Sequence, residues 1–139
     1  MDQSIFFVKP GFLEKADEIL EYLLSKVRCR TENRRVVSMS EEGWRKFYFN
    51  ISKKYPEGWA DMARAFSGRP ITLTTLVGDN VIVPVRKIVG PMRYEDNSNE
   101  TIRGMWGPYE LPNTIVHASS SREDFKRELA ILNDYCAEK

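Results

Sequence analysis

One histidine in the chain has surroundings in which it could carry out chemistry. His117, the only histidine, lies between Val116 and three serines at 119–121. Imidazole has a reference pKa of about 6.5 and is largely neutral in the cell, so one ring nitrogen can act as a nucleophile or a base. A lone histidine can equally be a hydrogen-bonded packing residue. The other residues of the chain must decide between these two roles.

Three basic residues stand where a phosphate could be bound. Lys9 follows the first apolar run, Arg86 lies in a segment of ambiguous structure, and Arg103 lies in Thr-Ile-Arg-Gly. An arginine can donate two parallel hydrogen bonds to a phosphate. The glycine-rich phosphate-binding loops are absent from the sequence, so side chains would have to make such a site. Taken singly, each residue could instead be a solvated strand end, a helix C-terminal charge or a loop salt bridge.

The elements that would position these residues follow from the hydrophobic periodicity, which switches between strand and helix spacing. Short apolar or alternating runs predict strands at residues 5–8, within 29–39, at 71–77 and at 113–116. Amphipathic spacing predicts helices over residues 12–27, 41–53, 59–66 and after residue 120. Two capping-box patterns would begin helices, Ser38-x-x-Glu41 and Ser120-x-x-Glu123.

Two further segments are less regular. Residues 81–85 have strand composition, but the segment ends with Arg86, Lys87 and Gly90, as a helix would, so local propensity leaves both structures open. Residues 91–100 are rich in polar residues and predict a long surface loop.

The order of the elements predicts an α+β fold, with helices packed against a mostly antiparallel sheet. In this arrangement His117 stands at the end of the last strand, just before a helix N-terminus. The free N–H groups and the dipole of a helix N-terminus favour negative charge. A phosphate could therefore be bound beside His117.

Length and composition indicate one compact domain. The 139 residues carry 21 basic and 20 acidic side chains, so no global charge attracts nucleic acid or anionic lipid. Cys29 and Cys136 match neither a close-spaced metal motif nor a disulfide framework. Residues 5–8 are too short an apolar run for a signal core or a membrane span. We expect a cytoplasmic protein without a membrane span.

Taken together, the motifs resemble those of the nucleoside diphosphate kinase family, from Ile5 to about Leu132. The ordered set that carries the resemblance is Phe7-Val8-Lys9-Pro10-Gly11, Arg86, Gly90-Pro91, Thr101-Ile102-Arg103-Gly104, Ile115-Val116-His117-Ala118-Ser119 and Glu128. The resemblance implies a single domain over residues 1–139 with a ferredoxin-like βαββαβ core, a four-stranded antiparallel sheet and additional helices. It also implies a helix over Val81 to Val89, despite Pro84.

The resemblance implies an enzyme that moves the γ-phosphoryl group of a nucleoside triphosphate such as ATP to a nucleoside diphosphate in a ping-pong cycle. His117 would be the nucleophile. Glu128 would accept a hydrogen bond from the far imidazole nitrogen, Ser119 would support that pair, and Tyr48 matches the family's active-site tyrosine.

The resemblance also implies the phosphate contacts. Lys9, Arg86 and Arg103 would hold the phosphates and neutralise the charge that develops during transfer. Mg²⁺ would arrive with the nucleotide, and no protein residues are expected to form a metal site. The family usually forms homo-oligomers, either tetramers or hexamers, and residues 91–100 are a candidate contact region.

Several candidate nucleotide contacts depart from the family's pattern. Gly11 and Ser120 stand where aspartates are usual, and Met92 takes the place of a phosphate-binding threonine. Thr114 stands where the family has asparagine for the sugar hydroxyl, while Asn113 lies one position earlier. Two further candidates for gripping the base are Tyr55 and Leu111.

Two alternative functions remain. One is a kinase-derived nucleotide-binding or oligomerisation module with little turnover, motivated by the departures at Met92, Thr114 and Ser120. The other is an RNA-recognition domain, since the βαββαβ core is shared and residues 103–107 faintly resemble its aromatic strand motif. Pro108 and the near-zero net charge argue against RNA.

Overall fold

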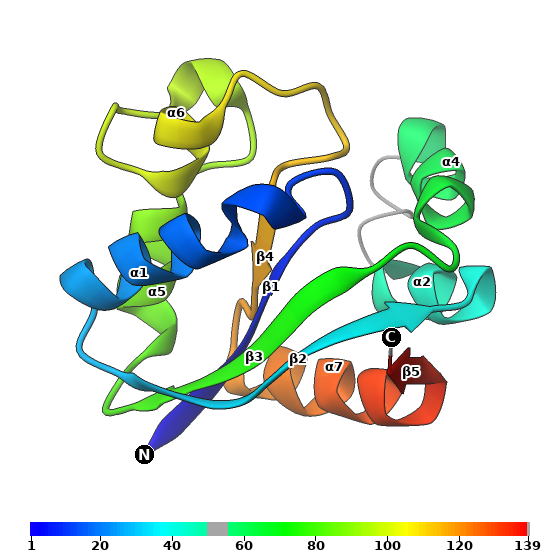
Figure 1. Cartoon of the computed structure of the whole chain (residues 1–139), viewed down its shortest axis with the longest axis horizontal. Helices are drawn as coiled ribbons and strands as arrows, with labels where there is room; N and C mark the ends of the chain where they lie inside the picture. Colours follow the sequence, from blue (N-terminus) through cyan, green and yellow to red (C-terminus); the bar gives the residue numbers. More distant parts are fainter. Residues whose placement is uncertain (50–55, 139) are drawn as a thin grey trace.

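A five-stranded antiparallel sheet forms the centre of the protein (Figure 1). The computed structural model describes residues 1–49 and 56–138. The strand order is β4-β1-β3-β2-β5. The strands are β1 (Asp2–Val8), β2 (Arg30–Met39), β3 (Ile71–Gly78), β4 (Val116–Ala118) and β5 (Cys136–Glu138).

Helices cover both faces of this sheet (Figure 1). One group packs around Phe6 and Val8 of β1, and the other packs around Ile5 and Phe7. Alternate residues of β1 thus point to opposite cores, which explains the unbroken apolar run in the sequence. The first group is α1 (Ala16–Lys26), preceded by the 3-10 turn η1 (Leu13–Lys15), with α5 (Ile82–Val89) and α6 (Ile102–Trp106); the second is α2 (Glu41–Phe47), α4 (Pro56–Phe66) and α7 (Arg122–Tyr135).

The α+β, ferredoxin-like prediction is confirmed, with one strand more than expected. The three residues of β5 pair with Val37 to Met39 at the outer edge of β2. A three-residue strand directly after a long helix has no periodicity of its own, so the sequence did not reveal it.

The segment around Pro84 is the helix α5, as the family resemblance implied. Proline is the third residue of this helix, where a backbone N–H has no partner within the helix in any case. Arg86 therefore lies on a helix and not on a strand.

Two helix starts were predicted wrongly. Ser38 is still part of β2, and the cap of α2 is Ser40, whose hydroxyl accepts from the Gly43 N–H at 3.2 Å. At α7 the cap is Ser121 and not Ser120, because Ser121 accepts from the Asp124 N–H at 3.0 Å. In both cases a serine closer to the helix has the geometry to bond the third helical N–H.

The predicted strand at 113–116 was also misplaced. Ile115 has φ of 72°, a left-handed conformation that an extended strand cannot contain and that a β-branched residue rarely adopts. Pairing with β1 therefore begins at Val116 and includes His117 opposite Phe7. The imidazole comes from the middle of β4 and not from its end.

The predicted helix over 41–53 is interrupted: α2 ends at Phe47, Tyr48 lies in a turn, and Phe49 is again helical, while residues 50–53 lie outside the described part of the chain. The polar loop after α5 contains the 3-10 turn η2 (Tyr94–Asp96). Asn97 orders this loop, since its amide donates to the carbonyls of Pro91 at 3.0 Å and Arg93 at 2.8 Å.

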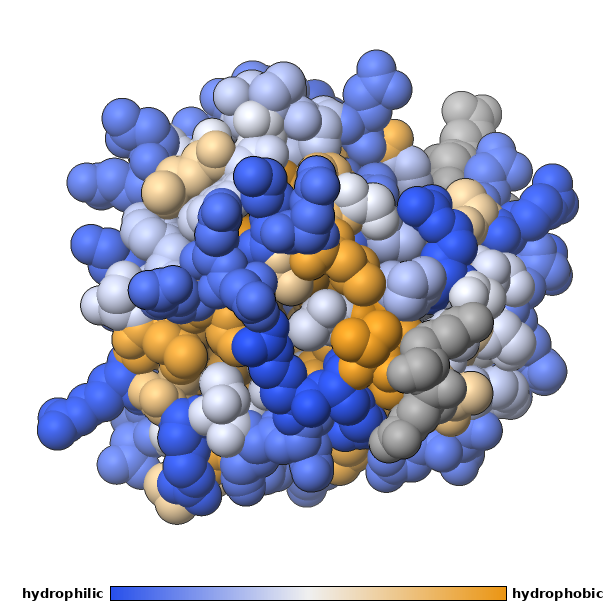
Figure 2. Space-filling model, in the orientation of Figure 1, coloured by the Kyte–Doolittle hydropathy of each residue, from blue (hydrophilic) through white to orange (hydrophobic). Residues whose placement is uncertain are grey.

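Hydrophilic side chains cover much of the face seen in Figure 2, and apolar residues show mainly towards its centre. Among residues 1–49 and 56–138, no helix combines the length and apolar character that a membrane span needs.

Candidate active site

The imidazole of His117 lies in an aromatic setting made by two different elements. The ring of Phe7, its partner on β1, stacks on it with a centroid distance of 5.0 Å. Phe47, the last residue of α2, meets it edge-on at 4.9 Å. The His117 side chain retains 15% exposure, so the ring is oriented by packing but open on one side.

Glu128 holds the other end of the imidazole. Its Oε2 lies 2.6 Å from His117 Nε2, and its Oε1 accepts from Ser119 Oγ at 2.7 Å. Burial alone would raise the pKa of the Glu128 carboxyl, yet His117, Ser119 and Arg127 hold that pKa below its usual value. The carboxylate is therefore ionised at neutral pH and can only accept. It follows that Nε2 carries the proton and that Nδ1 is the nitrogen with a free lone pair.

A second group of polar side chains consists of Lys9, Thr114 and Tyr48. Lys9 is only 2% exposed, and its Nζ donates to Thr114 Oγ1 at 2.9 Å. Burial, with a smaller contribution from the Arg103 charge, holds the pKa of Lys9 well below its usual value. The Nζ also lies 5.5 Å from the centre of the buried Tyr48 ring. Lys9, Tyr48 and Thr114 are thus brought together.

Arg103 is fixed mainly by the backbone. Its Nε donates to Thr114 O at 3.0 Å, Nη1 to Gly90 O at 2.8 Å, and Nη2 to Val116 O at 3.0 Å and to Thr114 Oγ1 at 2.9 Å. These bonds use most of the five N–H groups of a guanidinium. Arg103 therefore acts on the site chiefly as a fixed positive charge.

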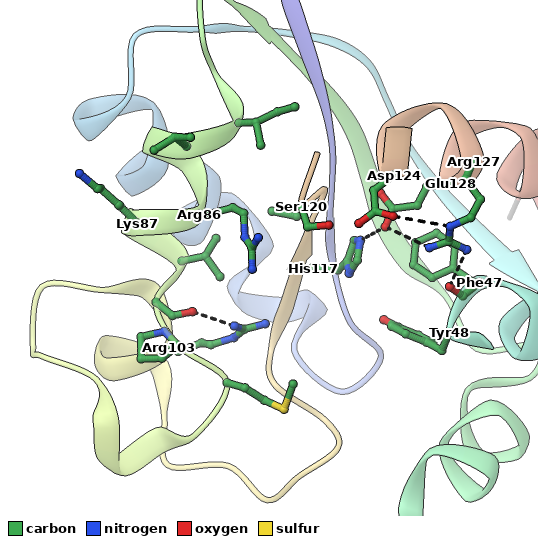
Figure 3. A pocket seen from close by; sticks show the side chains of 17 residues that line it. Phe47, Tyr48, Arg86, Lys87, Arg103, His117, Ser120, Asp124, Arg127 and Glu128 are labelled. Carbon is green, nitrogen blue, oxygen red and sulfur yellow. Dashed lines mark hydrogen bonds and ion pairs between the residues drawn. The ribbon is translucent and has the colours of Figure 1, made fainter. Parts of the chain in front are cut away.

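A cavity of about 750 Å³ opens over His117, between α5 and α7 (Figure 3). Arg86 lines it and is exposed, and its guanidinium makes no hydrogen bond or ion pair with the described residues. Its planar fork is therefore available to an anion, in contrast to that of Arg103. The lining also includes Tyr48, Met92, Arg103, His117, Ser120 and Glu128.

Some predicted contacts do not reach the cavity. Leu111 is 50% exposed and is not part of the lining. Asn113 donates its amide to Pro10 O at 3.1 Å, and Thr114 is buried, with its hydroxyl already accepting from two cations. Tyr55 lies outside the described residues.

The lining residues that the sequence reasoning did not single out include Phe47, Asp124 and Arg127. Asp124 lies four residues before Glu128 and shares a face of α7 with it, while Arg127 lies three residues after Asp124 and pairs with it at 3.7 Å. Extending the helical face around Glu128 would have found Asp124, whereas the contact of Arg127 with α2 depends on tertiary packing.

Within residues 1–49 and 56–138, the His, Cys, Asp and Glu side chains form no cluster of three that could hold a metal ion. Glu128, the most buried carboxylate of the lining, is already engaged by His117 and Ser119.

Sequence comparison connects the chain to one family. The family model described as nucleoside diphosphate kinase matches residues 2–135. The nucleoside diphosphate kinase of Methanosphaera stadtmanae is 30% identical, over 86% of this chain and 82% of that protein. Nucleoside diphosphate kinase 1 of Arabidopsis thaliana is 27% identical, over 94% of this chain and 87% of that protein.

Solved structures share the fold. The nucleoside diphosphate kinase of Borrelia burgdorferi, described as a transition-state mimic with bound vanadate and ADP, has a TM-score of 0.84 at 19% identity, covering 99% of this chain and 92% of that one. The apo enzyme from Encephalitozoon cuniculi also has a TM-score of 0.84, at 20% identity, covering 94% of this chain and 88% of that one.

Proposed function

The chain belongs to the nucleoside diphosphate kinase family, and on that premise we propose that it transfers the γ-phosphoryl group between nucleotides in two half-reactions, through a phosphohistidine at His117. The observation that carries this proposal is the 2.6 Å contact between His117 Nε2 and the Glu128 carboxylate. Because Nε2 is engaged, Nδ1 is the nitrogen that can attack phosphorus.

In the first half-reaction, the lone pair of Nδ1 forms a bond to the γ-phosphorus as the bond to the bridging β–γ oxygen breaks. The nucleoside diphosphate leaves with that electron pair, and the ring gains positive charge that the Glu128 carboxylate stabilises. Ser119 keeps the carboxylate in place. The second half-reaction is the reverse, with a different nucleoside diphosphate as the acceptor.

Positive charge around the cavity would bind and neutralise the phosphates. Arg86 would supply a two-pronged hydrogen bond, and Arg103 a fixed charge. The buried Lys9 would supply a further positive charge. A bound phosphate favours its protonated form despite burial. Tyr48 would contact the phosphate beside His117. Asn113 and Thr114 do not line the cavity, so Thr114 would act on the phosphates through Lys9 and Arg103, which donate to its hydroxyl, with Met92 at the phosphate loop.

Mg²⁺ would enter with the nucleotide and offset the negative charge of its phosphates. We further propose that the chain acts as one domain over residues 1–139, in the cytoplasm, as a homo-oligomer of four or six copies. Sedimentation analysis of the purified chain tests the oligomer size.

The test of the proposed function is phosphate transfer by the purified protein. Incubation with γ-labelled ATP and Mg²⁺ is expected to give an acid-labile phosphoprotein, and addition of a second nucleoside diphosphate is expected to remove the label as a new triphosphate. His117→Ala should lose both steps, whereas Glu123→Ala, at an exposed position of α7, should keep them. Equal labelling of the His117→Ala variant would refute the proposal. Nucleotide binding without labelling of the wild-type chain would instead indicate the turnover-deficient module.

A further inference from the structure

Arg127 connects the two elements that surround His117. Its Nη1 donates to the carbonyl of Phe47 at 3.0 Å and to that of Lys46 at 3.3 Å, at the C-terminal end of α2. The last carbonyls of a helix have no partner further along that helix, and a cation there also interacts favourably with the helix dipole. Arg127 therefore anchors the end of α2 onto α7.

The same guanidinium reaches the acidic residues of α7. Its Nη2 lies 4.0 Å from Glu128 Oε2, the oxygen that binds His117, and its Nε lies 3.7 Å from Asp124 Oδ1. The positive charge of Arg127 is one of the contacts that hold the pKa of Glu128 below its usual value. Figure 3 shows Arg127 between Glu128 and Phe47.

The end of α2 carries the aromatic residues that face the imidazole. Phe47 meets the His117 ring at 4.9 Å, and the Tyr48 ring lies 6.0 Å from it. A helix of seven residues is too short to be stable alone, so tertiary contacts must set its position. Arg127 donates to the backbone carbonyl of Phe47 itself, and Tyr48 is the next residue.

We propose that Arg127 is a positioning residue for phosphoryl transfer: it sets the end of α2 against α7 and thereby fixes Phe47 and Tyr48 relative to His117, while its guanidinium lies beside Glu128 Oε2. This inference rests on the proposed function. Arg127 does not need to touch the nucleotide in this role. Its side chain is 34% exposed, and its Nη1 donates to the carbonyls of Lys46 and Phe47.

Two variants separate geometry from charge. Arg127→Met removes both, and Arg127→Lys keeps the charge but replaces the planar fork with a single ammonium, which cannot reproduce its geometry. The matched control is Arg122→Met on the same helix, since Arg122 is exposed, pairs with Asp2 and does not line the cavity.

The first readout is the pH profile of single-turnover phosphorylation. We expect Arg127→Met to lower the maximal rate by about 10- to 100-fold, as small misplacements of reacting groups do. Its acid limb should move to higher pH, because loss of the cation lets the pKa of Glu128 rise. Arg127→Lys should lose rate but keep the acid limb near the wild-type position. KM for the nucleotide should change less than twofold in either variant.

The second readout needs no activity. Since His117 is the only histidine, the imidazole resonances in an NMR spectrum belong to one residue. Ring-current shifts from Phe47 should change in Arg127→Met and stay unchanged in Arg122→Met. An unchanged spectrum and acid limb in Arg127→Met would overturn the inference, as would a rise of KM with a constant maximal rate. If the wild-type chain forms no phosphohistidine while Arg127→Met still shifts the imidazole resonances, the proposed function fails and the positioning geometry stands.

Discussion

Ser119 ties the Glu128 carboxylate to β1, a strand inside the sheet. Its hydroxyl donates to Glu128 Oε1 at 2.7 Å and accepts from the backbone N–H of Ile5 at 2.9 Å. Ile5 belongs to β1, which also carries Phe7 against the imidazole. The carboxylate and the imidazole are thus both positioned by contacts with β1, at the buried residues Ile5 and Phe7.

Glu128→Gln is expected to reduce the rate of His117 phosphorylation by up to about 10⁴-fold, the order of loss when a carboxylate that orients a catalytic histidine becomes an amide. An amide can donate to the imidazole and lacks the charge that stabilises the phosphorylated ring. Single-turnover labelling with ATP measures the effect. Glu123→Gln on the exposed side of α7 is the control, and an equal loss in both variants would contradict the role of Glu128.

Lys9→Met is expected to raise stability while it weakens activity. Because the folded-state pKa of Lys9 lies below 10.5, the unfolded chain binds this proton more tightly than the folded protein does. Above about pH 10.5 Lys9 is neutral in both states and does not lower the free energy of unfolding. As pH falls from there to the folded-state pKa, the unfolded chain takes up the proton first, so the free energy of unfolding decreases.

Methionine removes that dependence, so we expect a gain of about 1–3 kcal/mol at pH 7, with loss of nucleotide turnover. Urea denaturation between pH 7 and pH 10 measures the gain. Lys15→Met, at an exposed position of η1, should show no such gain. A Lys9→Met protein that is less stable than the wild type at pH 7 and equally stable at pH 10 would contradict the prediction that the charge of Lys9 lowers the free energy of unfolding.

Thr114→Val removes one oxygen that serves two cations. Lys9 Nζ and Arg103 Nη2 each donate to Thr114 Oγ1 at 2.9 Å. Loss of an acceptor for buried donors costs about 1–3 kcal/mol, and Arg103 keeps its carbonyl partners. We expect KM for the nucleotide to rise several-fold, with a smaller change in kcat. Thr114→Ser keeps the hydroxyl and should stay close to wild type in steady-state kinetics; equal defects in both variants would point to packing.

Met92→Thr places a hydroxyl donor in the lining of the cavity. A hydrogen bond to a charged phosphate contributes about 1.5–3 kcal/mol, so KM for the nucleotide should fall by about tenfold or more. Met92→Val has a similar branched shape without the hydroxyl and should show no such fall. Isothermal titration with a nucleoside diphosphate compares the two variants. Similar affinities would show that the side chain at position 92 does not contact a phosphate.

Most of the architecture was predictable because local patterns reported it. Amphipathic spacing placed α1, α4 and α7, and the apolar run 5–8 marked a strand buried on both faces. The caps at Ser40 and Ser121 were missed by one or two residues, because several serines in sequence could each begin a helix. The left-handed Ile115 could not be foreseen, since β-branched residues disfavour that conformation.

The candidate site divides in the same way. Ser119 and Glu128, which contact one another beside His117, were named through the family resemblance. Arg127 was missed because its role depends on carbonyls of α2, about 80 residues earlier in the chain. Carbonyl groups are common to all residues, so no residue type in the sequence marks them as acceptors.

The anchoring of Arg103 by main-chain oxygens has a consequence for how the sequence can vary. Three of its four bonds end on the carbonyls of Gly90, Thr114 and Val116, which a side-chain substitution at those positions does not remove. Sequence drift around the cavity can therefore proceed without displacing this charge. The His117–Glu128 pair has no such protection, because both of its interacting groups are side chains. Divergent copies of this fold should lose the pair by substitution long before they lose the placement of Arg103.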